Sequence, residues 1–139
     1  MNKKIYCAGP ISGDLTYQAN YKKIIEIVKN NGFHPLYEPE LKPNYELTDE
    51  EIYRRDIKWL SDSIGMIAEV SGPSLGVGFE IAYALFTLNK PVLALCHESV
   101  PRLSAMIKGC GSPLLSVQKY KDEFELEKFI RIYLQLVLK

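Results

Sequence analysis

The sequence predicts an α/β protein with a flavodoxin-like, doubly wound, five-stranded parallel sheet and helices on both faces. Short apolar runs alternate with stretches that repeat apolar residues at helical spacing, and this order favours parallel strands joined by helices. The candidate strands are apolar on both faces, which is typical of a sheet covered on both sides. With 139 residues, 47% hydrophobic and 24% charged, the chain is expected to form a single domain over residues 1–139.

The elements follow from apolar runs and from their punctuation by glycine, proline and capping residues. Strands are expected at residues 4–8, 33–37, 64–70, 91–96 and 114–117. Helices are expected at residues 15–31, 48–61, 76–88, 101–108 and 123–138. Thr48 and Glu51 have the spacing of a capping box and mark the start of the second helix. Residues 38–47 hold two prolines and no periodicity, so we expect a loop there.

Charge and cysteine content exclude several classes of protein. Seventeen basic and seventeen acidic residues give a net charge of zero, which argues against a nucleic-acid partner but not against a small anionic ligand. No apolar run approaches the roughly 18 residues of a membrane span, so no membrane partner is expected. Cys7, Cys96 and Cys110 form no CxxC pair, and His34 and His97 do not complete a zinc pattern. We interpret the three cysteines as reduced thiols of a cytoplasmic protein without a metal site.

Ligands of doubly wound sheets bind at the carboxyl ends of the strands, so the loops there are the segments to inspect. The first of these loops, Gly9–Gly13, contains small residues that let the backbone approach a ligand, and Ser12 offers a hydroxyl. It matches neither a P-loop nor GxGxxG, and a tight turn is the alternative. The other two loops are residues 70–78 and 97–104.

The helix expected after the third strand opens with Gly76 and Gly78, whose free N–H groups and positive dipole end suit an anion. Glu80 is expected in the first turn of this helix, where the dipole favours the ionised carboxylate. An ionised carboxylate beside an anion site is a candidate nucleophile. The alternative is an ordinary acidic residue at a helix start.

Asp56 is the unusual residue of the second expected helix, because it lies on the apolar stripe. Its neighbours one turn away are Ile52, Trp59 and Leu60. Such an acid either pairs with a base, Arg55 or Lys58, or points into a pocket. Adjacent helix positions do not face one another well, so we expect the pocket, where burial raises the pKa and suits general acid catalysis.

Two carboxylates in different environments are what cleavage of a glycosidic bond requires. One is ionised and attacks or stabilises the anomeric carbon, and the other handles the proton of the leaving group. Tyr6, near the end of the first strand, offers a hydroxyl that could orient the nucleophile. A core aromatic is its alternative role.

Four blocks of sequence carry a resemblance to a known family. They are Ala68–Glu80 (AEVSGPSLGVGFE), Tyr6–Gly13 (YCAGPISG), Asp56–Leu60 (DIKWL) and Leu103–Gly109 (LSAMIKG). Together they resemble the 2′-deoxynucleoside 5′-monophosphate N-glycosidases, relatives of the nucleoside 2-deoxyribosyltransferases. The blocks stand in the order of that family and span most of the chain.

The resemblance implies a role for each matched residue. Glu80 matches the carboxylate that attacks the anomeric carbon, Asp56 the acid/base near the departing base, and Tyr6 the tyrosine that orients the nucleophile. The implied substrate-binding positions are Gly9, Pro10, Ile11, Ser12, Tyr21, Ser74, Gly76, Ser104, Ala105 and Met106. The segment 104–106 matches one that reaches into the site of a neighbouring subunit, so a homodimer is implied. The implied reaction needs no metal and no cofactor.

One position departs from the pattern of the family. Better-known members have an arginine that helps to hold the phosphate where this chain has Ser12. The 38–47 loop has no counterpart that can be matched, and it is a candidate for setting the base preference.

Three functions follow from these observations. The favoured one is hydrolysis of a nucleoside 5′-monophosphate, 2′-deoxy in the first instance, to free base and sugar phosphate through a glycosyl-enzyme. The second is a transferase that exchanges bases between deoxynucleosides. The third is a nucleotide-binding module without turnover, which fold alone does not exclude.

Overall fold

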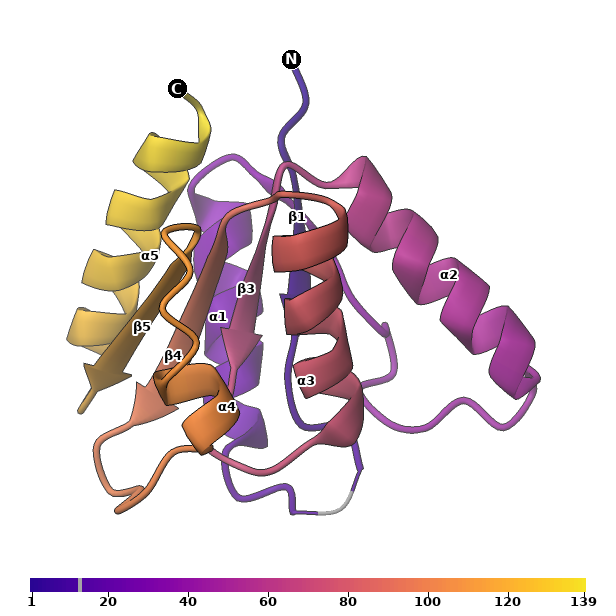
Figure 1. Ribbon diagram of the computed structural model, residues 1–139, viewed down its shortest axis with the longest axis horizontal. Coiled ribbons are helices and arrows are strands. Elements are labelled where there is room, and N and C mark those ends of the chain that lie inside the picture. The colour runs from indigo at the N-terminus through magenta and orange to yellow at the C-terminus, as the bar shows by residue number, and fades with distance from the viewer. Residues whose placement is uncertain (13) are drawn as a thin grey trace.

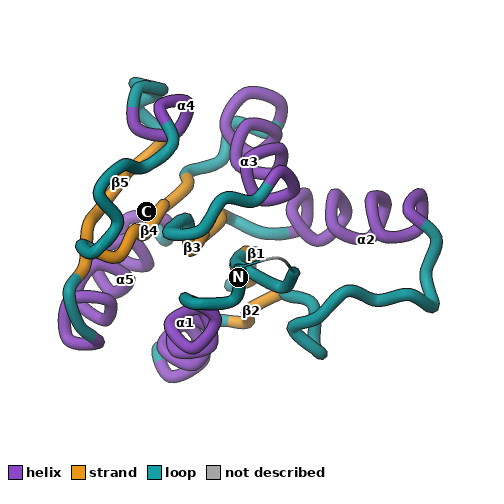
Figure 2. Tube along the Cα trace, turned by 90° about the horizontal axis from the view of Figure 1, so that it is seen from below, coloured by secondary structure: helices purple, strands orange, loops and turns teal. Residues whose placement is uncertain are grey.

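The computed structural model describes residues 1–12 and 14–139, so Gly13, the last residue of the first ligand-facing loop, lies outside the described residues. Five parallel strands form one sheet in the order β2-β1-β3-β4-β5 (Figure 1, with β2 labelled in Figure 2). The strands are β1 (Lys4–Ala8), β2 (His34–Leu36), β3 (Gly65–Glu69), β4 (Val92–His97) and β5 (Leu115–Tyr120). This is the flavodoxin-like strand order, and it confirms the expected fold class.

Helices cover both faces of the sheet (Figure 2). They are α1 (Gln18–Asn30), α2 (Asp49–Asp62), α3 (Leu75–Ala82), α4 (Ala105–Lys108) and α5 (Glu123–Val137). Helices α1 and α5 pack on one face, and α2, α3 and the segment before α4 pack on the other. The alternation of side chains along each strand supplies both cores: Ile5 and Cys7 join the first, while Tyr6 and Ala8 join the second. Tyr6 therefore faces the layer that carries α2 and α3.

Several elements differ from the expected ones; α1, for example, begins at Gln18 rather than at residue 15. The helix expected at 76–88 is α-helical only to Ala82 and continues as a π-helical segment, η1 (Tyr83–Thr87). The helix expected at 101–108 begins only at Ala105, because Leu103 first turns inward and is buried in the core beneath α3. Strand β5 extends to Tyr120, since backbone pairing with β4 continues past its apolar residues.

Helix α2, which carries Asp56, is anchored at both ends. At its start, the expected capping box is present: the Thr48 hydroxyl accepts from the Glu51 N–H, and the Glu51 carboxylate accepts from the Thr48 N–H. At its end, the Lys90 ammonium donates to the carbonyls of Leu60 at 3.0 Å and Ser63 at 2.6 Å. These contacts satisfy backbone groups that a helix terminus leaves unpaired, and they fix the helix beside the sheet.

Among the helices of the described residues, none combines the length and the apolar character that crossing a membrane requires.

Candidate active site

A cavity of about 710 Å³ lies where β1 ends, between α2 and α3. It brings together Tyr6 from β1, Asp56 from the middle of α2 and Glu80 from α3. These three residues are separated by up to 74 positions in the sequence. The location agrees with the general rule that open α/β sheets bind ligands beyond the carboxyl ends of their strands.

The Tyr6 hydroxyl donates a hydrogen bond to Oε2 of Glu80. Burial, and then the charges of Glu80 and Asp56, raise the pKa of Tyr6 far above its usual range, so the hydroxyl keeps its proton and remains a donor. Burial raises the pKa of Glu80 to about 7; the bond from Tyr6 opposes this shift, and Asp56 adds to it. The carboxyl group of Glu80 is therefore poised to change its protonation state near neutral pH.

The structure corrects the expected environment of Glu80. Helix α3 begins at Leu75 and has no acidic residue in its first turn, so Glu80 lies in the second turn. The dipole effect fades beyond the first turn. Burial then decides the protonation of Glu80, and it favours the neutral form rather than the ionised form that the sequence suggested.

Asp56 lines the cavity as expected, but it also pairs with a base. Its Oδ1 accepts from Nε of the adjacent Arg55 at 3.0 Å. The expectation that adjacent bases do not face Asp56 well was wrong for Arg55, because its side chain is long enough to bring Nε to the neighbouring carboxylate. Burial raises the pKa of Asp56, and the pairing with Arg55 opposes that effect. The direction of the shift is the one expected.

Glu38 is a second acid that pairs with Arg55, and it was not identified from the sequence. It follows β2, its side chain is only 7% exposed, and its Oε2 accepts from Arg55 Nη1 at 2.6 Å. The guanidinium of Arg55 also lies over the Trp59 ring, 4.5 Å from its centroid. No local pattern marks Glu38, because it lies in an aperiodic loop and meets Arg55 only in the folded chain.

The loop after β1 forms another part of the cavity wall. Gly9, Ile11 and Ser12 line the cavity, as does Tyr21 from α1. A Cβ at Gly9 would lie 2.4 Å from the Tyr21 ring, and that ring is held by a 2.8 Å hydrogen bond from its hydroxyl to the Cys7 carbonyl. Glycine is therefore required for the loop to approach the Tyr21 ring of α1 this closely.

Pro10 is placed differently from its neighbours. It does not line the cavity, and its carbonyl accepts from the Gln18 amide of α1 at 3.0 Å. This residue supports the loop rather than facing a ligand.

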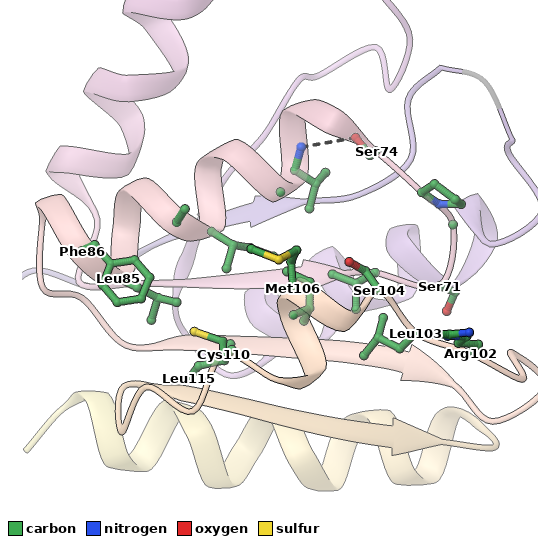
Figure 3. A pocket seen from close by; sticks show the side chains of 18 residues that line it. Ser71, Ser74, Leu85, Phe86, Arg102, Leu103, Ser104, Met106, Cys110 and Leu115 are labelled. Carbon is green, nitrogen blue, oxygen red and sulfur yellow. Dashed lines mark hydrogen bonds between the residues drawn. The ribbon is translucent and has the colours of Figure 1, made fainter.

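Ser74 and Gly76 lie on the cavity wall at the start of α3. The Ser74 hydroxyl caps the helix by accepting from the Val77 N–H at 3.2 Å (Figure 3). The N–H groups of Leu75 and Gly76 have no hydrogen-bond partner within the described part of the chain. Two backbone donors at a helix N-terminus are thus available to an anion.

The described residues contain no group of three or more histidine, cysteine, aspartate or glutamate side chains that could hold a metal ion.

The sequence matches the nucleoside 2-deoxyribosyltransferase family over residues 5–126. The chain belongs to this family. A Thermofilum pendens protein with the provisional name 2′-deoxynucleoside 5′-phosphate N-hydrolase 1 is 41% identical, with 86% of each chain covered. A 5-hydroxymethyl-dUMP N-hydrolase of Danio rerio is 35% identical, covering 97% of this chain and 98% of that protein.

The family fold is also seen in a solved structure, that of a CMP N-glycosidase of Clostridium botulinum. The TM-score is 0.69, and the superposition covers 94% of this chain and 99% of that one. At 18% identity, this likeness concerns the fold alone.

Residues 104–106, which are expected to reach into the site of a partner subunit, do not line the Glu80 cavity of their own chain. Ser104 and Met106 line a second cavity of about 730 Å³ on the other side of α3 (Figure 3). Ala105 lies between them, at the start of α4, and does not line either cavity. Met106 is 83% exposed, and Phe86 across the groove is 67% exposed.

Proposed function

We propose that this protein hydrolyses the N-glycosidic bond of nucleoside 5′-monophosphates, 2′-deoxynucleotides in the first instance, to free base and sugar 5-phosphate. The contact between Tyr6 and Glu80, in one cavity with Asp56, is the observation that carries this proposal. The names of the two relatives support it, because both are described as N-hydrolases of deoxynucleoside monophosphates.

In the proposed reaction, the ionised Glu80 carboxylate attacks C1′ of the sugar. The C1′–N bond breaks, its electron pair stays with the base, and Asp56 supplies a proton to the leaving nitrogen. Tyr6 holds Glu80 in position through its hydrogen bond. Water, deprotonated by Asp56, then attacks C1′ of the glycosyl-enzyme and releases Glu80.

The phosphate is proposed to bind at the start of α3 and at the loop after β1. The free N–H groups of Leu75 and Gly76, with the hydroxyls of Ser74 and Ser12, supply donors there. The described residues proposed for this subsite include no side-chain cation, since Ser12 stands where better-known members have an arginine. We therefore propose that backbone N–H groups carry more of the phosphate contact than in those members.

The working unit is proposed to be a homodimer of one-domain chains, residues 1–139, in the cytoplasm. The exposed Met106 and Phe86 beside the second cavity support a partner copy, whose Glu80 cavity would receive residues 104–106. Free thiols at Cys7, Cys96 and Cys110 support a reducing compartment.

The test is chromatography of reactions with a panel of nucleotides and nucleosides, deoxy and ribo. The wild type is expected to release free base from deoxynucleoside monophosphates. Glu80→Gln is expected to lower this rate by at least about 1,000-fold while the protein stays folded. Glu26→Gln, an exposed acid on the opposite face of the sheet, is the matched control and should retain the wild-type rate.

Two results would replace this assignment. Exchange of the base with an added free base, faster than hydrolysis and without preference for a phosphate, would identify a deoxyribosyltransferase. A nucleotide that stays bound and intact during a long incubation would identify a binding module. Turnover retained in folded Glu80→Gln would exclude Glu80 as the nucleophile.

A further inference from the structure

Arg55 is the one basic side chain among the described residues that line the Glu80 cavity. It is held from three sides: by Glu38 at 2.6 Å, by Asp56 at 3.0 Å and by the face of the Trp59 ring. A guanidinium is planar and presents its donors in a fixed fork, so three such contacts define its position and its plane.

We propose that Arg55, held by Glu38, is the positioning residue of this site. It fixes the Asp56 carboxylate in the cavity, and its positive charge allows Asp56 and Glu80 to occupy the same cavity. Arg55 acts through Asp56 rather than on the reacting atoms. This inference rests on the proposed function, because Asp56 must be placed correctly only if it exchanges a proton with a leaving base.

The charge balance of the cavity shows why such a cation is needed. Its ionisable side chains among the described residues are Tyr6, Cys7, Tyr21, Glu38, Tyr45, Asp49, Tyr53, Arg55, Asp56 and Glu80. Without Arg55, the carboxyl groups of Glu38, Asp56 and Glu80 would face one partly dry space with no basic side chain among the described residues that line it. Like charges in such a space suppress ionisation, and an attacking carboxylate has to be ionised.

Arg55 and Glu38 act on Asp56 with opposite signs. Burial raises the pKa of Asp56; Arg55 lowers it, and the negative charge of Glu38 raises it. Burial also raises the pKa of Glu80, and Arg55 again lowers it. Removal of Arg55 is therefore expected to raise the pKa of Asp56, and removal of the charge of Glu38 is expected to lower it.

Glu38 contributes a second effect through the loop that it begins. Its backbone carbonyl accepts from the Leu41 N–H at 3.0 Å, and residues 43–45 and Leu47 of the same loop line the cavity. The ion pair between Glu38 and Arg55 thus ties this loop to α2. It couples the position of Asp56 to the wall that a substrate would contact.

The experiment measures the titration of individual carboxyl groups by ¹³C NMR, with the signals of Asp56 and Glu80 assigned through Asp56→Asn and Glu80→Gln. Arg55→Met is expected to raise the pKa of both groups, whereas Glu38→Gln is expected to lower that of Asp56. Arg54→Met removes an exposed arginine that pairs with Glu50 on the same helix, and it is expected to shift neither. Opposite shifts from the two variants would not arise from a general loosening of the fold.

Base release is measured on the same variants across pH. Arg55→Met is expected to move the acidic limb of kcat/KM to higher pH and to lower kcat by up to about 100-fold. Arg55→Lys retains the charge but not the fork, so its acidic limb should stay near that of the wild type while kcat falls about 10-fold. Wild-type kcat in Arg55→Lys, or unchanged titration in Arg55→Met, would overturn the proposal.

The two measurements also separate this inference from the proposed function. Shifted titrations in a protein that releases no base would retain the electrostatic role of Arg55 and reject the hydrolase. Base release with unshifted titrations would retain the hydrolase and reject the electrostatic role of Arg55. Should Arg55→Met fail to fold, the kcat of Arg55→Lys and the titration of Glu38→Gln decide the outcome.

Discussion

Two tyrosine–glutamate pairs occur among the described residues, and they are built differently. The Tyr6 hydroxyl donates to Glu80 at the cavity, and the Tyr120 hydroxyl donates to Glu69 at the ends of β5 and β3. Glu69 also accepts from the Ser71 N–H at 2.7 Å and the Ser71 hydroxyl at 2.8 Å, and it is 2% exposed. Among the described residues, Tyr6 is the one hydrogen-bond donor to Glu80.

This difference in donors separates a structural carboxyl group from one available for chemistry. Burial raises the pKa of Glu69, but three donors favour its ionised form, and Ser71 in turn accepts from the His97 N–H of β4. Glu69 thus joins three strand ends. Glu80 keeps lone pairs that face the cavity, where a substrate rather than the protein can use them.

The largest effect expected on stability comes from removal of the structural acid. Glu69→Ala leaves three donors without an acceptor in the interior, and it should lower the free energy of unfolding by about 3–5 kcal/mol. Urea denaturation of this variant beside Glu26→Ala measures the loss. A loss below about 1 kcal/mol would show that Glu69 does not join the strand ends.

Replacement of the cavity acid, Glu80, by glutamine is expected to raise the free energy of unfolding at neutral and higher pH. Because burial raises the pKa of Glu80 from 4.5 to about 7, the folded protein binds this proton more tightly than the unfolded chain does. The contribution of Glu80 to stability is therefore lost as pH rises from about 4.5 through 7, and Glu80→Gln lacks this contribution.

Thermal unfolding at two pH values tests this expectation. At pH of about 8, Glu80→Gln should exceed the wild type by about 1–3 kcal/mol, and at pH of about 4 the two should coincide. A variant that is less stable than the wild type at the higher pH would contradict the assigned environment of Glu80.

Removal of a single hydroxyl from either tyrosine is expected to have smaller effects, which distinguish the two pairs. Tyr120→Phe should lower the free energy of unfolding by about 1–2 kcal/mol and leave the pH dependence of base release unchanged. Tyr6→Phe removes a bond that lowers the pKa of Glu80, so the acidic limb of kcat/KM should move to higher pH. Equal effects of both variants on the pH profile would remove the distinction between the pairs.

Several features of the site could be predicted from the sequence because they depend on local patterns. The isolated acid on the apolar stripe of α2 identified Asp56, and the capping box located the start of that helix. Tyr6 was identified by its hydroxyl near the end of the first expected strand, and in the structure it lines the same cavity. Burial then raises the pKa of Asp56 in the expected direction.

Other features could not be predicted because they depend on contacts between distant segments. Glu38 lies in an aperiodic loop, and its contact with Arg55 spans 17 positions. The protonation of Glu80 follows from its burial behind Tyr6, 74 positions away, and not from its place in a helix. The second cavity likewise requires α3 and its continuation η1 to lie beside the α4 segment, which follows about 20 residues later in the chain.

The succession of strands and helices, the doubly wound fold class and the three residues proposed for the reaction were all predicted from the sequence, because apolar periodicity and short motifs act locally. The tertiary structure decided their electrostatics. Whether Glu80 is charged, what holds Asp56 and which glutamate is structural depend on burial and on donors from remote strands and loops. Those quantities exist only once the chain has excluded water from the cavity wall.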